Sequence, residues 1–192
     1  MAAIRISYVR ATFAAGLLAG CRSSLLRVTD LLECERSTAQ FARRRSGDDR
    51  SVPDLVDKPK LVAAALYAEW IADALHRQIA FYFQLDNRVA DTFWMPQLPP
   101  TEPPPQAPRE WPLPPLPEPL GATPEPLRRV PGVARHRARI VVRLQEIRED
   151  LDEAIRAINW SRNVRFQTEI CGAVTSLREW AVLSASAVAE DG

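Results

Sequence analysis

Apolar residues recur at three- and four-residue steps along four long stretches of this chain, and polar or charged residues fill the positions between them. Because this spacing places the apolar side chains on one face of an α-helix, each stretch predicts an amphipathic helix. The predicted helices run from about Ala2 to Arg45, from Asp57 to Trp94, from Val133 to Trp160 and from Val164 to Val188. No part of the sequence has the pattern of a strand, so we predict an all-α fold.

The first two helices are separated by a polar segment that contains Gly47 and Pro53, and we expect them to form an antiparallel hairpin over residues 1–95. Asp57 is a candidate N-cap of the second helix. The expected buried face of the first helix consists of Ile6, Val9, Phe13, Leu17, Leu18, Cys21, Leu25, Val28 and Leu32. That of the second consists of Val62, Leu66, Trp70, Ile71, Leu75 and Ile79.

The last two helices predict a second hairpin over residues 132–192, because the apolar phase shifts across residues 161–163. In the third helix the apolar residues alternate four and three apart, as they do in the seam of a coiled coil. The members of this predicted seam are Ile140, Leu144, Ile147, Leu151 and Ile158.

Between the hairpins lies a segment, residues 96–131, that holds 15 of the 17 prolines. Such a density of proline excludes a regular helix or a paired strand and favours the extended polyproline II conformation. Because this arm has a single glycine and several large apolar side chains, we expect it to be stiff and to lie along a surface. Its candidate contact residues are Arg109, Trp111, Pro112, Leu113, Pro115 and Leu116. Residues 109–117 also fit the pattern of a ligand for an SH3 domain.

Charge is nearly balanced over the whole chain, with 25 Lys and Arg against 24 Asp and Glu, so the overall field favours no particular partner. Locally, however, arginines gather around the start of the third helix. Their positions are Arg128, Arg129, Arg135, Arg137, Arg139 and Arg143. These residues are a candidate contact for nucleic acid or for an acidic protein surface, and the alternative is a solvated helix start.

The sequence Leu18-Ala19-Gly20-Cys21 resembles the cleavage site of a bacterial lipoprotein signal, and Cys21 is therefore a candidate for lipidation. The apolar stripe of the first helix nevertheless continues through this point, and Arg22 follows the cysteine directly. We favour an uncut helix and keep the lipoprotein as the alternative.

Catalytic chemistry has little support in the sequence. His76 and His136 are isolated, and Cys21, Cys34 and Cys171 lack the spacing of a metal or redox site. We therefore expect no enzyme activity, no cofactor and no small-molecule substrate. No uncharged run approaches the roughly 20 residues that a membrane-spanning helix needs.

The sequence thus predicts a non-catalytic structural subunit of a larger assembly, such as a phage virion or another bacterial complex, in the bacterial cytoplasm or the virion. In this hypothesis the helices and the arm contact neighbouring protein subunits, either copies of the chain or other proteins. A lipoprotein of the bacterial envelope with a Pro-rich spacer is the alternative. An adaptor that presents residues 109–117 to an SH3 domain is the third hypothesis.

Overall fold

The computed structural model describes residues 2–47, 57–94, 113–122, 125–128, 130, 132–158 and 164–189, and their side chains except in 2–8, 78–94, 125–126 and 164–167. Its helices are α1 (Ala2–Arg45), α2 (Lys58–Trp94), α3 (Glu125–Arg128), α4 (Val133–Ile158) and α5 (Val164–Ala189). No strand occurs among the described residues, so the all-α prediction is confirmed. The four long helices agree with the predicted ones to within two residues at each end, whereas the single turn of α3 was not predicted.

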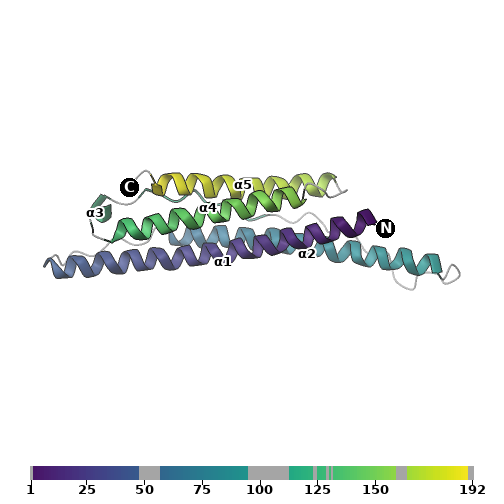
Figure 1. The fold of residues 1–192 in the computed structure, drawn as a ribbon, viewed down its shortest axis with the longest axis horizontal. Coiled ribbons are helices and arrows are strands. Elements are labelled where there is room, and N and C mark those ends of the chain that lie inside the picture. The colour runs from purple at the N-terminus through teal and green to yellow at the C-terminus, as the bar shows by residue number, and fades with distance from the viewer. Residues whose placement is uncertain are drawn as a thin grey trace.

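The four long helices pack together around a shared core (Figure 1). Helix α1 contacts both α2 and α4, α4 contacts α5, and α2 meets α5 more sparsely. Helices α1 and α5 run in one direction and α2 and α4 in the other, so each helix is antiparallel to its neighbours (Figure 1). The two helix pairs on either side of the Pro-rich segment therefore pack on each other and bury one continuous apolar cluster.

The side chains that α4 buries are the ones that its apolar pattern predicts. All five residues of the predicted seam are at most 4% exposed, and Val133 and Ala154 extend the same face. Opposite them, α5 contributes Ile170, Val174, Leu177, Trp180, Ala181 and Val188. Burial of a large aliphatic side chain stabilises a fold by about 1.5–3 kcal/mol, so this half of the core supplies a large share of the apolar stabilisation.

In α1 and α2 part of the predicted buried face is wrong. Val9 and Phe13 are 65% and 49% exposed, and Val62, Leu66 and Trp70 are 37%, 47% and 42% exposed. The rest of the predicted faces is confirmed, with these residues at most 3% exposed: Leu18, Cys21, Leu25, Val28, Leu32, Ile71 and Leu75. Seven alanines fill core positions beside them: Ala14, Ala15, Ala64, Ala65, Ala68, Ala72 and Ala74. Small side chains at helical spacing let two helix backbones approach closely, and the larger side chains on the neighbouring stripe then remain outside. Ile6 and Ile79 lie outside the described side chains.

A buried ion pair joins the two halves of the bundle, that is, the pair α1 and α2 and the pair α4 and α5, at the point where α1 passes the start of α4. Arg137 Nε lies 2.7 Å from Glu35 Oε2, and Arg137 Nη2 donates to Glu35 Oε1 at 2.8 Å. Both residues are at least nine-tenths buried. Nearby, Gly132 has a φ of 93°, and a Cβ there would lie 3.4 Å from Thr38 Cγ2. A glycine is therefore favoured at this turn, because other residues rarely adopt a positive φ.

Candidate functional site

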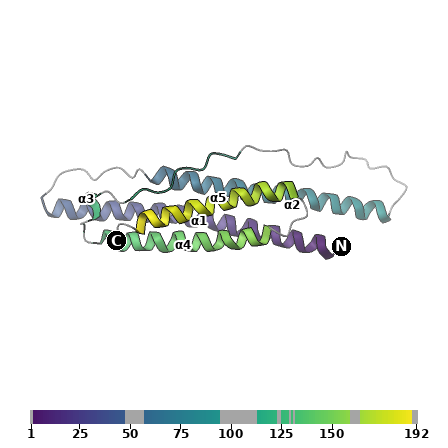
Figure 2. The ribbon, with the colours of Figure 1, turned by 90° about the horizontal axis from the view of Figure 1, so that it is seen from above.

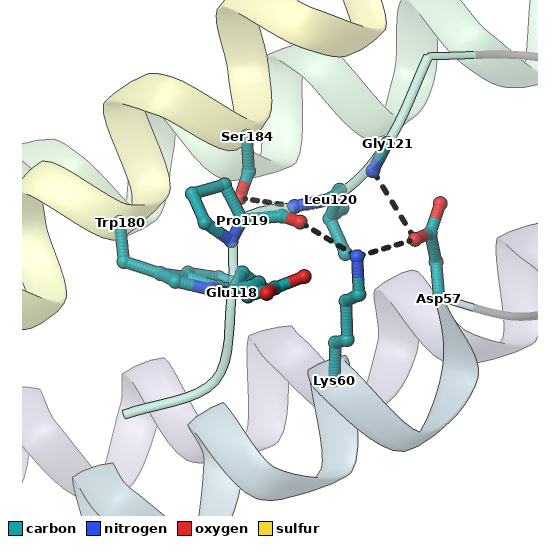
Figure 3. Close-up of polar contacts among 8 residues, drawn as sticks. All are labelled: Asp57, Lys60, Glu118, Pro119, Leu120, Gly121, Trp180 and Ser184. Atoms are coloured by element: carbon teal, nitrogen blue, oxygen red, sulfur yellow. Dashed lines mark hydrogen bonds and ion pairs between the residues drawn. The ribbon is translucent and has the colours of Figure 1, made fainter. Parts of the chain in front are cut away.

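The described part of the Pro-rich segment, residues 113–122, lies between α2 and α5 (Figure 2). Its backbone has no helical or strand hydrogen bonds, so its polar groups take partners from both helices (Figure 3). On the α5 side, Trp180 Nε1 donates to the carbonyl of Glu118 at 3.0 Å, and Ser184 Oγ accepts the N–H of Leu120 at 3.0 Å. These contacts explain why α2 and α5 themselves meet only sparsely.

On the α2 side, Lys60 Nζ donates to the carbonyl of Pro119 at 2.9 Å, and the N–H of Gly121 donates to Asp57 Oδ1 at 3.1 Å. Asp57 precedes α2, and its carbonyl accepts the N–H of Leu61 at 3.1 Å. Asp57 thus occupies the predicted N-cap position of α2, while its side chain binds the backbone of residue 121, a role that the sequence does not indicate. No local pattern could reveal this role, since Asp57 and Gly121 are 64 residues apart.

The apolar side chains of the same segment face the bundle. Leu120 is 3% exposed, and Leu113 and Leu116 are half-buried against the core, while Pro115 is exposed. The other predicted contact residues of the arm, Arg109, Trp111 and Pro112, lie outside the described residues. In residues 113–122 the apolar side chains are therefore already in contact with the chain's own helices.

Cys21 lies in the middle of α1 and is fully buried. Its thiol donates to the carbonyl of Ile147 on α4 at a distance of 3.9 Å. Burial, with a smaller effect from the negative charge of Asp150, raises the pKa of this thiol to about 12. Removal of residues 1–20 would also take Ala14, Ala15 and Leu18 out of the core. The environment of Cys21 is thus that of a structural, unreactive thiol.

The arginines of the predicted basic cluster are separated by the fold. Arg137 points into the core, where it pairs with Glu35, so it is not available to an outside partner. Arg143 pairs with Glu146 on its own helix at 2.6 Å. Arg128, in α3, is exposed and has a partner within the chain, and Arg129 lies outside the described residues. Arg135 and Arg139 remain as exposed cations on the outside of α4.

The second half of the same α4 surface is acidic. Glu146, Glu149 and Glu153 are exposed there, and Asp150 is partly buried beside them. The pKa of Asp150 is raised, first by desolvation and then by the charges of the three glutamates. The outside of α4 is therefore basic over residues 135–139 and mainly acidic over residues 146–153, where Glu149 Oε1 lies 3.8 Å from Arg148 Nη2. Arg156 is exposed in its last turn.

A groove of about 830 Å³ opens to solvent between the second half of α1 and the start of α2. We call it the α1–α2 groove. Its α1 wall is polar, with Glu33, Arg36, Ser37 and Gln40, whereas its α2 wall includes Val62, Ala63 and Leu66. Trp70 continues the line of Val62 and Leu66 by one further helical turn along α2.

Two ion pairs connect α1 and α2 along this side of the bundle. Lys58 pairs with Glu33 at the groove, and Arg22 Nε lies 3.0 Å from Glu69 Oε2 further along. Neither ion pair covers the apolar row of Val62, Leu66 and Trp70, which remains in contact with solvent. The apolar pattern of the sequence includes Val62, Leu66 and Trp70, but it predicts that they belong to the core, whereas the structure leaves them exposed.

Within the described part of the chain there is no cluster of His, Cys, Asp or Glu side chains that could bind a metal ion. Nor is any helix, among the residues described, both long and apolar enough to span a membrane. No known protein family, no curated protein and no solved structure matches this chain, and its function has to be inferred from its own residues.

Proposed function

We propose that this protein is a non-catalytic structural subunit that joins a larger assembly through the outer faces of its helices. The observation that carries the proposal is the exposed row of Val62, Leu66 and Trp70 beside the α1–α2 groove. Trp and other large apolar residues gathered at a groove are typical of contact surfaces between proteins, while isolated exposed apolar residues need no explanation.

The walls of the groove indicate the chemistry of its partner. One wall is apolar and the other is polar, so the surface fits an amphipathic helix of another protein. The apolar stripe of that helix would cover Leu66 and Trp70, and its polar flank would face Ser37 and Gln40 on α1. Spacing of four residues along α2 matches the i, i+4 spacing of such a stripe.

In the same proposal the Pro-rich arm as a whole is a stiff, extended strap that fastens the bundle. Support comes from residues 113–122, whose hydrogen bonds reach α2 and α5. A strap of this kind holds two helices together without the regular hydrogen bonds of a strand. The contacts with neighbouring subunits are accordingly assigned to the helices, and not to residues 113–122.

The two other hypotheses receive less support. Lipidation of Cys21 would require loss of residues that belong to the core, and it would act on a thiol that is buried in the fold. For the SH3 ligand, Arg109 and Pro112 lie outside the described residues, and Leu116 packs against the bundle.

The proposal is tested by the sedimentation of the full-length protein in extracts of its native source. We expect the wild type to sediment with a large complex and to retain residues 1–20, which mass spectrometry of its peptides can check. Leu66→Glu combined with Trp70→Glu should release it, because two charges would be buried in the groove contact.

A matched control is Ser176→Glu combined with Leu183→Glu, which adds two charges to exposed positions of α5. This variant should stay in the complex, and circular dichroism should show that both variants keep their helices. Sedimentation of the wild type as a small, free species would contradict the proposal. A chain that begins at Cys21 and carries acyl mass would replace it with the lipoprotein.

A further inference from the structure

The outer face of α4 has a charge pattern that is complementary to itself. We define this face by Arg135, Arg139, Val142, Glu146, Glu149 and Glu153, which follow one another at steps of three and four residues and are all exposed. The first two residues are basic and the last three acidic, and Val142, 52% exposed, lies between them. Arg143 and Glu146 pair with each other at the point where the charge changes sign.

The pattern has a centre at residue 144. Arg135 precedes this position by nine residues and Glu153 follows it by nine, while Arg139 and Glu149 are each five residues away. If two copies of α4 lie antiparallel and cross at this centre, Arg135 of one copy meets Glu153 of the other, and Arg139 meets Glu149. A two-fold axis makes each of these contacts twice, as in any isologous interface.

From this arrangement we propose that the outer face of α4 is a self-docking surface, on which a second copy of the chain binds with its own α4 antiparallel. The inference rests on the proposed function, because it names one neighbour of the assembly subunit as another copy of the same chain. Val142 of each copy lies near the axis and supplies the apolar centre of the contact.

A second copy fits this face better than a nucleic acid does. A polyanion would be attracted by Arg135 and Arg139 but repelled by three exposed glutamates on the same surface. The acidic half also repels itself: the pKa of Asp150 is raised first by desolvation and then by the negative charges of the neighbouring glutamates. Opposite an arginine-rich surface this repulsion is relieved, and the basic half of a second copy is such a surface.

A contact of one helix on one helix is small, and most of its complementarity is electrostatic. We therefore expect an association that is weak and strongly salt-dependent. The probe is the purified full-length protein itself, studied by sedimentation equilibrium at about 50 mM and about 500 mM salt. The dimer should dissociate at least about tenfold more readily at the higher salt concentration.

Charge-swap variants test the pairing directly. Arg135→Glu with Arg139→Glu makes all four outer charged positions acidic, and Glu149→Arg with Glu153→Arg makes all four basic, so each variant alone should be monomeric. An equimolar mixture of the two should form a dimer, because positions 135 and 139 of each chain then meet opposite charges at positions 153 and 149 of the other. The control Arg27→Glu with Arg77→Glu carries the same change of charge at exposed positions of α1 and α2 and should dimerise like the wild type.

A wild type that is monomeric at low salt would overturn the inference, and so would a dimer that the Arg135 and Arg139 changes leave intact. Failure of the mixture to dimerise would also overturn it. These results would not affect the proposed function, whose test depends on Leu66 and Trp70. Conversely, a charge-swapped pair that dimerises would support self-docking even if the groove variants remained in their complex.

Discussion

Helices α2 and α4 both carry rows of large apolar side chains at helical spacing, but the row on α4 is buried whereas one row on α2 is exposed. In α4, Ile140, Leu144 and Ile147 are buried, and the opposite face is charged. In α2, Leu66 and Trp70 remain exposed although alanines such as Ala68 are fully buried. The comparison shows that a buried face is chosen by how closely two helices can approach, and not by the size of its side chains alone.

The consequence of this difference is functional. Helix α4 buries most of its large apolar side chains in the core and exposes mainly charged ones, so its outer face recognises a partner chiefly by electrostatics. Helix α2 packs through five alanines together with larger side chains such as Ile71 and Leu75, and it leaves an apolar row outside, next to a groove. We therefore propose different partners for the two faces: a copy of the chain on α4, and an amphipathic helix on α2.

The largest effect is expected at the junction of the two halves. Arg137→Met should lower the free energy of unfolding by about 3–5 kcal/mol, because it leaves the buried carboxylate of Glu35 without its partner. Urea unfolding measures this change. The double variant Glu35→Met with Arg137→Met should recover most of it. Arg22→Met, which breaks an exposed pair with Glu69, should cost no more than about 1 kcal/mol.

Replacement of a leucine by alanine should show the difference between α4 and α2 most directly, as a difference in the loss of stability. Leu144→Ala removes a fully buried side chain of α4 and should cost about 2–5 kcal/mol. Leu66→Ala on α2 removes a side chain that is 47% exposed and should change the stability of the isolated chain by about 0.5 kcal/mol or less. Equal losses in urea unfolding would mean that the row on α2 belongs to the core after all.

Enlargement of a buried alanine should also lower the stability. Ala68→Leu places extra volume between helices that are packed through small side chains, and it should cost about 1–3 kcal/mol. The control Ala63→Leu adds the same volume to the groove wall, where space is open. Thermal unfolding should show a clear decrease for the first variant only, and a tolerated leucine at position 68 would contradict close packing.

A smaller effect is expected where the arm meets α5. Trp180→Phe keeps an aromatic ring in the core but removes the N–H that donates to the carbonyl of Glu118, so it should cost about 1 kcal/mol. Hydrogen exchange should show faster opening at Leu120, whose amide is bound to Ser184 next to this contact. Unchanged exchange at Leu120 would mean that the two hydrogen bonds are independent.

At neutral pH the smallest effect is that of the Cys21 thiol, which contributes no change in stability with pH until the solution becomes alkaline. Because burial raises the pKa of its thiol from about 9 to about 12, the folded state holds this proton more tightly than the unfolded state does. The resulting stability is complete below pH 9 and is lost as the pH rises towards 12, by at most about 1.4 kcal/mol per pH unit. Cys21→Ala should lose less stability over this range than Cys34→Ala, whose exposed position makes it the control.

How much could be predicted differs between the two halves for a physical reason. The helices of both halves followed from periodicity, and the buried face of α4 followed because one face is apolar and the other charged. In α2 the row of Val62, Leu66 and Trp70 has the same helical spacing as the buried row that contains Ala64, Ala68, Ile71 and Leu75, and either could have been the core. The partners of Asp57 and Arg137 were unpredictable, since Gly121 and Glu35 are distant in sequence.

The sequence by itself determined where the helices begin and end, because helix formation depends on side chains three and four residues apart. It also determined that residues 96–131 cannot continue those helices, since proline lacks the amide hydrogen and fixes φ. Only the tertiary structure decided that residues 113–122 lie between α2 and α5, that Arg137 is buried while Arg135 and Arg139 are not, and that Leu66 and Trp70 face solvent. These outcomes depend on which surfaces meet across the bundle, and local spacing carries no information about that choice.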